Sequence, residues 1–185
     1  ANISHTTTSI DGTSALHNTT DSNASIVSDD DKLGLAIFGQ NTSKDAWDAN
    51  GDGFTELSKI SGQTVGFRGY VKTGLYSKIT AEYHHLEEFR RGGDNLDLPP
   101  HEAMIAEQTK HGINTGGLKF DWFSKDQKHR LNVFASLQHI NRDSYYGAGM
   151  DPNAYGNTTD LTWVGGAQYV YKADKCLFMP SDLTV

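Results

Sequence analysis

Hydrophobic and polar residues alternate at every second position in several stretches of the chain. In residues 161–172, one set of alternate positions includes Leu161 and Trp163, whereas the other includes Thr162 and Gln168. Strict alternation is typical of antiparallel β-strands with one apolar face and one polar face. The same pattern recurs in five further stretches: 33–40, 63–72, 75–88, 113–123 and 129–141. The sequence therefore predicts an all-β protein.

The connections between these stretches alternate in length. Residues 72–74 and 124–128 are short polar turns, whereas residues 43–60, 90–111 and 143–160 are long. The stretches run for about 10–14 residues, and a strand that crosses a bilayer needs about 9–11. Short turns at one end and long loops at the other are typical of outer-membrane barrels. The predicted fold is an antiparallel, up-and-down transmembrane β-barrel segment of about six to eight strands.

Composition agrees with this prediction and excludes several other classes. The hydrophobic fraction of 36% lies below the roughly 45–50% of globular proteins and suits strands with one polar face. The net charge of −7 argues against a nucleic-acid partner. No run approaches 18 apolar residues, so no transmembrane helix is predicted. Cys176 stands alone, which excludes an internal disulfide and a cysteine-rich zinc site.

Five segments of the chain carry a resemblance to a known family. They are residues 32–41, 48–54, 82–85, 88–93 and 97–102. These segments resemble TonB-dependent outer-membrane receptors of the Bacteroides type that take up siderophores or vitamin B12. The resemblance extends over nearly the whole chain and corresponds to early strands of the receptor barrel.

The resemblance implies a location and a function. Residues 1–185 would form part of the receptor's β-barrel domain in the cell outer membrane, as an incomplete barrel without the family's plug domain. The complete barrel has about twenty-two strands around the plug. The family actively takes up a large, scarce nutrient such as a ferric siderophore or cobalamin. The implied partners are that nutrient, the outer-membrane lipids and the TonB energy-transducing complex, which acts through the missing plug.

The sharpest local motif is a glycine-containing loop with oxygen-bearing residues at every second position. Five of them occupy positions 1, 3, 5, 7 and 9 of an EF-hand-like loop: Asp48, Asn50, Asp52, Phe54 (through its carbonyl) and Glu56. Lys59 replaces the glutamate expected at position 12, so this is not a complete EF-hand. The spacing predicts a structural Ca²⁺ site in an outer loop. A solvated turn built on the two glycines is the alternative.

Two further loops carry residues that suit ligand capture. Adjacent arginines can hold a carboxylate or phosphate, or can anchor their own loop to nearby acids. Tyrosines in a glycine-rich loop can contact a large ligand or pack against neighbouring loops. The candidates for ligand contact are Arg90, Arg91, Tyr145, Tyr146 and Tyr155.

No arrangement of residues predicts an enzyme, since the sequence contains no nucleophile elbow and no zincin motif. The charged residues of the predicted strands fall on one face, which would be the lumen wall: Arg68, Glu82, Lys119, Asp121 and Arg130. Two alternatives remain open. One is a self-contained eight-stranded barrel that binds a ligand. The other is a secreted calcium-binding β-protein whose apolar face packs against a second sheet.

Overall fold

A computed structural model describes the backbone of residues 1–176 and 179–184, and the side chains outside residues 174–182 and 185. The Cys176 side chain therefore lies outside the described part. The described chain is almost entirely β-structure, which confirms the predicted fold class. Its elements are β1 (Asn2–Ser9), β2 (Leu16–Val27), β3 (Leu33–Lys44), β4 (Lys59–Gly74), β5 (Ser77–Gly93), the short 3-10 helix η1 (Pro100–Glu102), β6 (Ile105–Phe123), β7 (His129–Ala148), β8 (Tyr155–Cys176) and β9 (Met179–Thr184).

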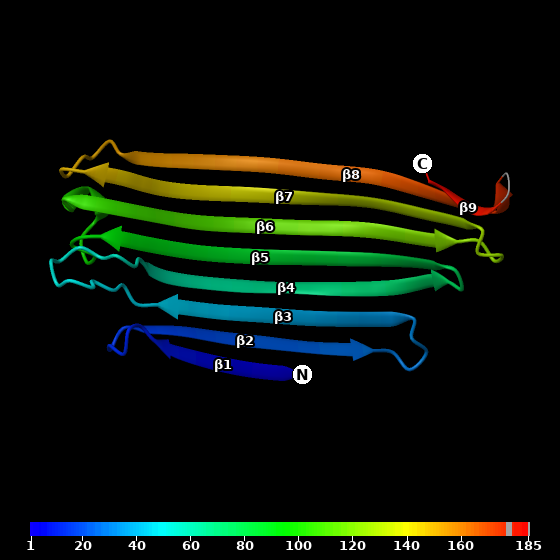
Figure 1. Cartoon of the computed structure of the whole chain (residues 1–185), viewed down its shortest axis with the longest axis horizontal. Coiled ribbons are helices and arrows are strands. Elements are labelled where there is room, and N and C mark those ends of the chain that lie inside the picture. The colour runs from blue at the N-terminus through cyan, green and yellow to red at the C-terminus, as the bar shows by residue number, and fades with distance from the viewer. Residues whose placement is uncertain (177–178, 185) are drawn as a thin grey trace.

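All nine described strands belong to one sheet in sequence order, and each pairs antiparallel with the next. The predicted up-and-down order is therefore confirmed. The sheet is open, with β1 and β9 as its edges, and is not closed into a barrel (Figure 1). Residues 45–58, 94–104 and 149–154 connect strands at one end, which we call the loop end, whereas residues 28–32, 75–76 and 124–128 lie at the opposite turn end (Figure 1).

The number of strands exceeds the predicted six to eight. The strand β9 was not predicted, because its sequence offers little alternation of apolar and polar residues. The strands β1 and β2 lie outside the six alternating stretches, since Ser, Thr and Asn dominate this region. In the structure β2 pairs along β3, which carries the clearer pattern, and β1 pairs along β2.

The strands are also longer than predicted, so the loops are shorter. The strands β6, β7 and β8 have 19, 20 and 22 residues. The strands at the loop end extend into the predicted loops 90–111 and 143–160. Of those two loops, only residues 94–104 and 149–154 lie outside strands. In these extensions both faces of the sheet carry polar residues, and the alternation that identifies a strand is lost.

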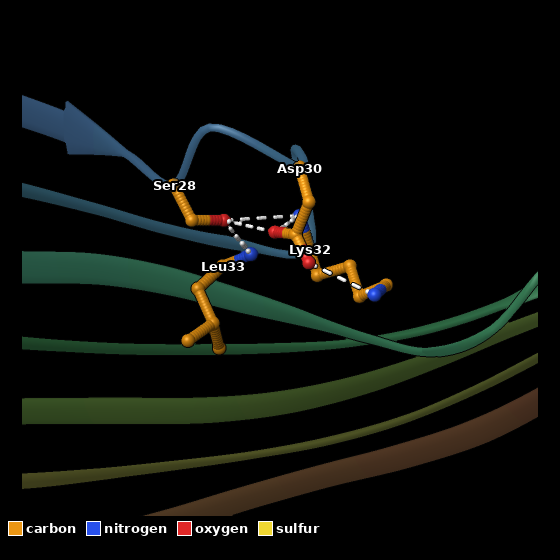
Figure 2. Close-up of polar contacts among 4 residues, drawn as sticks. All are labelled: Ser28, Asp30, Lys32 and Leu33. Atoms are coloured by element: carbon orange, nitrogen blue, oxygen red, sulfur yellow. Dashed lines mark hydrogen bonds and ion pairs between the residues drawn. The ribbon is translucent and has the colours of Figure 1, made fainter.

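Two turn-end connections share one design, and Figure 2 shows the first of them. The Ser28 hydroxyl accepts hydrogen bonds from the backbone N–H groups of Lys32 (3.1 Å) and Leu33 (3.0 Å). The Asp30 carboxylate accepts from Ser28 Oγ at 2.8 Å and pairs with Lys32 Nζ at 2.9 Å. The fourth residue, Asp31, has a φ of 55°, in the left-handed region.

The turn between β6 and β7 repeats this Ser-x-Asp-x-Lys pattern. Ser124 Oγ bonds the Asp126 carboxylate and accepts from the His129 N–H group at 3.0 Å. Gln127 takes the left-handed conformation, with a φ of 57°. In both turns, side chains satisfy backbone N–H groups that have no strand partner, and this holds the five-residue connection tight.

The sheet is a single layer with little covered surface. Among the described residues, the buried hydrophobic side chains are Ala103, Ala106 and Tyr145, all near the loop end. The accessible surface is 12344 Å², where a globular protein of 20.3 kDa would expose about 8,800 Å². A sheet must cover its apolar face to be stable. This sheet therefore needs a non-aqueous phase or a second layer of protein against that face.

Candidate functional site

One face of the sheet carries a continuous apolar surface toward the turn end. Residues that pair across neighbouring strands share a face, as do alternate residues along a strand. By this rule the register places on one face the members of what we call the apolar band: Ile26, Leu33, Leu35, Ile37, Val65, Phe67, Val71, Ile79, Leu118, Phe120, Trp122, Leu131, Val133, Leu137, Leu161, Trp163, Tyr169 and Tyr171. The six alternating stretches predicted from the sequence thus present their apolar sides together.

The apolar band is open to the surroundings. The exposed fraction is 60% for Leu118 and 76% for Trp163. Exposed apolar patches of this extent are unusual on soluble monomers and mark a surface that meets a partner or a membrane.

The apolar band ends abruptly along each strand. Toward the loop end, the same face presents a row of paired residues that includes no large apolar side chain. This polar row consists of Thr20, Asn41, Gln63, Glu87, Gly112, Asn141 and Thr159. The polar row therefore bounds the apolar band on this face, although the strands run on without interruption. Beyond the polar row, the same face carries Tyr145 and Tyr155 at the loop end.

The opposite face, which we call the polar face, carries the charged residues expected to share one side. Arg68 and Glu82 pair across β4 and β5 with 3.8 Å between Nε and Oε2. Lys119 Nζ lies 3.1 Å from Asp121 Oδ1 on the same face. The predicted grouping of Arg68, Glu82, Lys119, Asp121 and Arg130 follows from the register.

At the loop end, the predicted calcium loop forms a compact turn. Asp48 accepts hydrogen bonds from the backbone N–H groups of Gly51 (2.7 Å) and Gly53 (2.8 Å). These bonds, chiefly that from Gly53, hold the pKa of Asp48 below its ordinary value. Glu56 Oε2 accepts from the N–H group of Ala49 at 2.6 Å. Positive φ angles at Gly51 (75°) and Gly53 (86°) let the chain curl around the aspartate.

In the structure, the side-chain oxygens of this loop accept hydrogen bonds from other groups of the same loop. Asp52 Oδ1 accepts from the Phe54 N–H group at 2.9 Å, and Asn50 Nδ2 donates to Asp52 Oδ2 at 3.0 Å. The described side chains include no group of three or more His, Cys, Asp or Glu placed to hold a metal ion. Calcium binding by Asp48, Asn50, Asp52, Phe54 and Glu56 therefore stays a prediction.

The predicted calcium loop is clamped to the hairpin of β5 and β6. The Thr55 N–H group donates to the Gly93 carbonyl at 3.1 Å, and the Gly93 N–H group donates to Thr55 Oγ1 at 3.0 Å. Ser58 Oγ donates to Glu107 Oε1 at 2.6 Å. Gly93 has a φ of 105°, and a Cβ there would lie 2.0 Å from the Ile105 carbonyl oxygen, so only glycine fits. Sequence reasoning missed this clamp, because it joins residues 38 positions apart.

Two of the ligand candidates are buried beside that hairpin. The Arg91 side chain is 2% exposed and donates to the carbonyl oxygens of Gly92, Asp94 and Asn95. Burial lowers the pKa of this guanidinium from its ordinary value. Tyr145 is 0% exposed, and its hydroxyl donates to the Asp151 carbonyl at 2.9 Å. Both side chains hold loops in place.

Tyr155 covers this buried cluster from outside. Its ring meets the Tyr145 ring edge-on, with 4.9 Å between centroids. Its hydroxyl lies 2.7 Å from Nδ1 of His101, in the short helix η1. The contact joins the start of β8 to the β5–β6 connection, so the loop end forms one packed unit.

The other two ligand candidates lie on the polar face. Because Arg90 and Arg91 are neighbours on a strand, their side chains leave opposite faces, and they do not converge on one anion. Arg90 Nε bonds Glu88 Oε1 at 2.7 Å, which raises the pKa of the guanidinium. Tyr146 lines a cleft of about 420 Å³ together with Phe54, Glu56 and Glu107. This cleft links the predicted calcium loop to one of the predicted ligand residues.

Comparison with protein-family models found no match, and searches of curated proteins and of solved structures found no significant match. The described part of the chain contains no long apolar helix of the kind that crosses a membrane. The resemblance to TonB-dependent receptors therefore stays a prediction from the sequence.

Proposed function

We propose that this chain is part of the wall of a β-barrel receptor in the cell outer membrane, with the apolar band against lipid. The observation that carries the proposal is the division of one sheet face into the apolar band and the polar row. A bilayer has a boundary of this kind, because its hydrocarbon core ends at the headgroups.

The dimensions of the apolar band support a bilayer as its partner. On β8 the alternating apolar and aromatic residues run from Leu161 to Tyr171, a length of about 33 Å at about 3.3 Å per residue. A strand tilted by about 40° covers about 25 Å of height over that length, which is the height of the lipid-facing band of such barrels. Trp163 at one end and Tyr169 and Tyr171 at the other suit the two aromatic girdles.

The same observation weighs against a second sheet as the partner. In a sandwich, the inward face stays apolar over the length that packs, since the second sheet runs alongside it. Here the polar row begins partway along strands that continue for several more residues. The open sheet formed by the described strands also has no enclosed interior of the kind that a self-contained small barrel would use to bind a ligand.

The polar face and the loop end agree with the same proposal. The polar face carries charged pairs that suit a water-filled or plugged lumen. Long connections lie on the external side of outer-membrane barrels, so the loop end would face the outside. Residues that approach an external ligand would then include Arg90, Tyr146 and Tyr155, whereas Arg91 and Tyr145 hold the loops.

We further propose, from the sequence resemblance, that the nutrient is a ferric siderophore or cobalamin and that TonB drives its uptake. The test uses cells that lack the gene and cells that carry it in trans. The protein is expected in the outer-membrane fraction, and the deletion is expected to abolish high-affinity uptake of one radiolabelled nutrient. Restoration by the gene in trans is the control.

Two results would contradict this proposal at different points. A protein found only in the soluble fraction would overturn the membrane location. Outer-membrane location with unchanged uptake of both nutrients would overturn the receptor function and leave the location intact.

Calcium is proposed as a structural ion of the loop that carries Asp48 and Asp52. Binding to the folded state alone would stabilise it by about 2.7 kcal/mol at a concentration one hundred times the dissociation constant. We expect Ca²⁺ to raise the unfolding midpoint of the chain in detergent, and Asp52→Asn to remove the shift. Asp97→Asn, in the β5–β6 connection, is the matched control and should keep it. An equal Ca²⁺ response in both variants would exclude this loop.

A further inference from the structure

The polar face has a cleft of about 600 Å³ at the turn end, between the β4–β5 and β6–β7 turns. It lies at the opposite end of the strands from the loops discussed above. The charged side chains in its lining are four bases and a single carboxylate: Lys72, Lys78, Lys119, Arg130 and Asp121. The positive surplus contrasts with the net charge of −7 of the whole chain.

The register of the strands brings these charges together. Lys72 on β4 is the direct partner of Lys78 on β5, and Lys78 in turn is the partner of Asp121 on β6. Directly opposed residues have Cβ atoms about 4.5–5.5 Å apart, and like charges in such positions are destabilising. Two lysines, Lys72 and Lys78, nevertheless occupy directly opposed positions on neighbouring strands here.

The single carboxylate does not neutralise the group. Asp121 Oδ1 is bound by Lys119 Nζ at 3.1 Å and by Asn132 Nδ2 at 2.8 Å. Among the described side chains, Lys72, Lys78 and Arg130 form no ion pair. Within the described residues, these three positive charges therefore have no carboxylate within ion-pair distance, and Lys78 acts on Asp121 only through its electrostatic field.

Aromatic rings hold two of these cations without cancelling their charge. Lys78 Nζ lies 5.8 Å from the centre of the Tyr70 ring, and the Arg130 guanidinium lies 5.4 Å from the centre of the Phe123 ring. Such contacts position a cation while its charge stays available to a ligand. Phe123 and Tyr76 also add an aromatic wall to the cleft.

We propose that this cleft binds a ligand through a phosphate or diphosphate group. Lysine and arginine are the usual partners of phosphate, and charge-assisted bonds to it are roughly twice as strong as neutral ones. Several surplus charges suit a group with two or more negative charges better than one carboxylate. The volume of about 600 Å³ falls in the range of about 300–1,000 Å³ for ligand sites, so the cleft accommodates more than the phosphate alone.

The ligand's phosphate could belong to a soluble molecule or to a lipid headgroup. The cleft opens on the polar face, away from the apolar band, and this favours a soluble ligand. The proposal stands on the cleft and does not depend on what covers the apolar band.

The test measures binding of inorganic pyrophosphate to the full chain in a neutral detergent by titration calorimetry. We expect one site, weakened by salt, with an affinity reduced at least about tenfold in the double variant Lys72→Gln and Lys78→Gln. The matched control is the double variant Lys44→Gln and Lys110→Gln, which changes the net charge equally outside the cleft and should bind like the parent. Far-ultraviolet circular dichroism checks that both variants keep the sheet.

A second arm compares phosphatidylglycerol and phosphatidylcholine vesicles. Saturable pyrophosphate binding that only the cleft variant loses supports a soluble ligand. Binding confined to phosphatidylglycerol vesicles and lost only in the cleft variant assigns the cleft to a headgroup. No binding in either arm, or equal loss in the cleft and control variants, overturns the proposal.

Discussion

Val133→Arg is expected to cost about 2–4 kcal/mol of unfolding free energy when the chain is reconstituted in phosphatidylcholine vesicles. Val133 lies on β7 within the apolar band, between Leu131 and Leu137. An arginine there would have to leave water for hydrocarbon, because the proposed location puts this position deep in the bilayer. Urea unfolding followed by tryptophan fluorescence measures the change.

Two further variants on the same strand distinguish the effect of depth in the bilayer from the effect of the sheet face. Asn141 lies on the same face as Val133, in the polar row. Asn141→Arg should lower the unfolding free energy by no more than about 1 kcal/mol, because the cost of a charge is small near the membrane interface. Ser136 lies on the polar face, and Ser136→Arg should cost a similarly small amount of unfolding free energy. Equal costs at all three positions would show that this face does not meet a bilayer.

Arg91→Ala should destabilise the loop end by about 2–4 kcal/mol. The variant leaves three carbonyl oxygens, those of Gly92, Asp94 and Asn95, without the donor that Arg91 provides, and hydrogen bonds to charged groups contribute about 1.5–3 kcal/mol each. Removing a buried side chain also leaves a cavity. Amide hydrogen exchange at Gly93 and Ile105, which flank the connection, reports the local loss.

The neighbouring arginine provides the matched control. Arg90→Ala removes a guanidinium that is half exposed and pairs with Glu88, and pairs of this kind contribute less than about 1 kcal/mol. Arg91→Lys should fail to restore stability, since an ammonium cannot present the planar fork of arginine. If Arg90→Ala and Arg91→Ala cost the same, Arg91 does not hold the loop.

The sequence was most informative where one face of a strand is apolar and the other polar. Residues 129–141, apart from Phe134 and Ile140, and residues 161–172 follow the alternation, and the structure pairs them so that Leu137 lies beside Trp163 and Val133 beside Ala167. Where both faces are polar, as from Asn141 toward Ala148, the same strand gives no signal of period two. The strands continue there because their backbones stay paired, which side-chain patterning does not reveal.

The loop end was harder to predict, for a different reason. Arg90 and Arg91 are identical in type and adjacent in sequence, yet one pairs with Glu88 at the surface and the other is buried under its own loop. That difference depends on contacts between distant segments, such as Thr55 with Gly93. Likewise, the surplus charge at Lys72 and Lys78 emerges only when the register places the two side by side.

The central claim is that the apolar band faces lipid, and the three tryptophans allow a direct measurement. Trp122 and Trp163 belong to the apolar band, near its turn end and its loop end, whereas Trp47 lies in the β3–β4 connection beside Leu57. Three variants that each retain one tryptophan, with the other two changed to Phe, are reconstituted in vesicles with brominated lipids. The account predicts strong quenching of Trp122 and Trp163 and none of Trp47. Equal quenching of all three, or quenching of none, would contradict it.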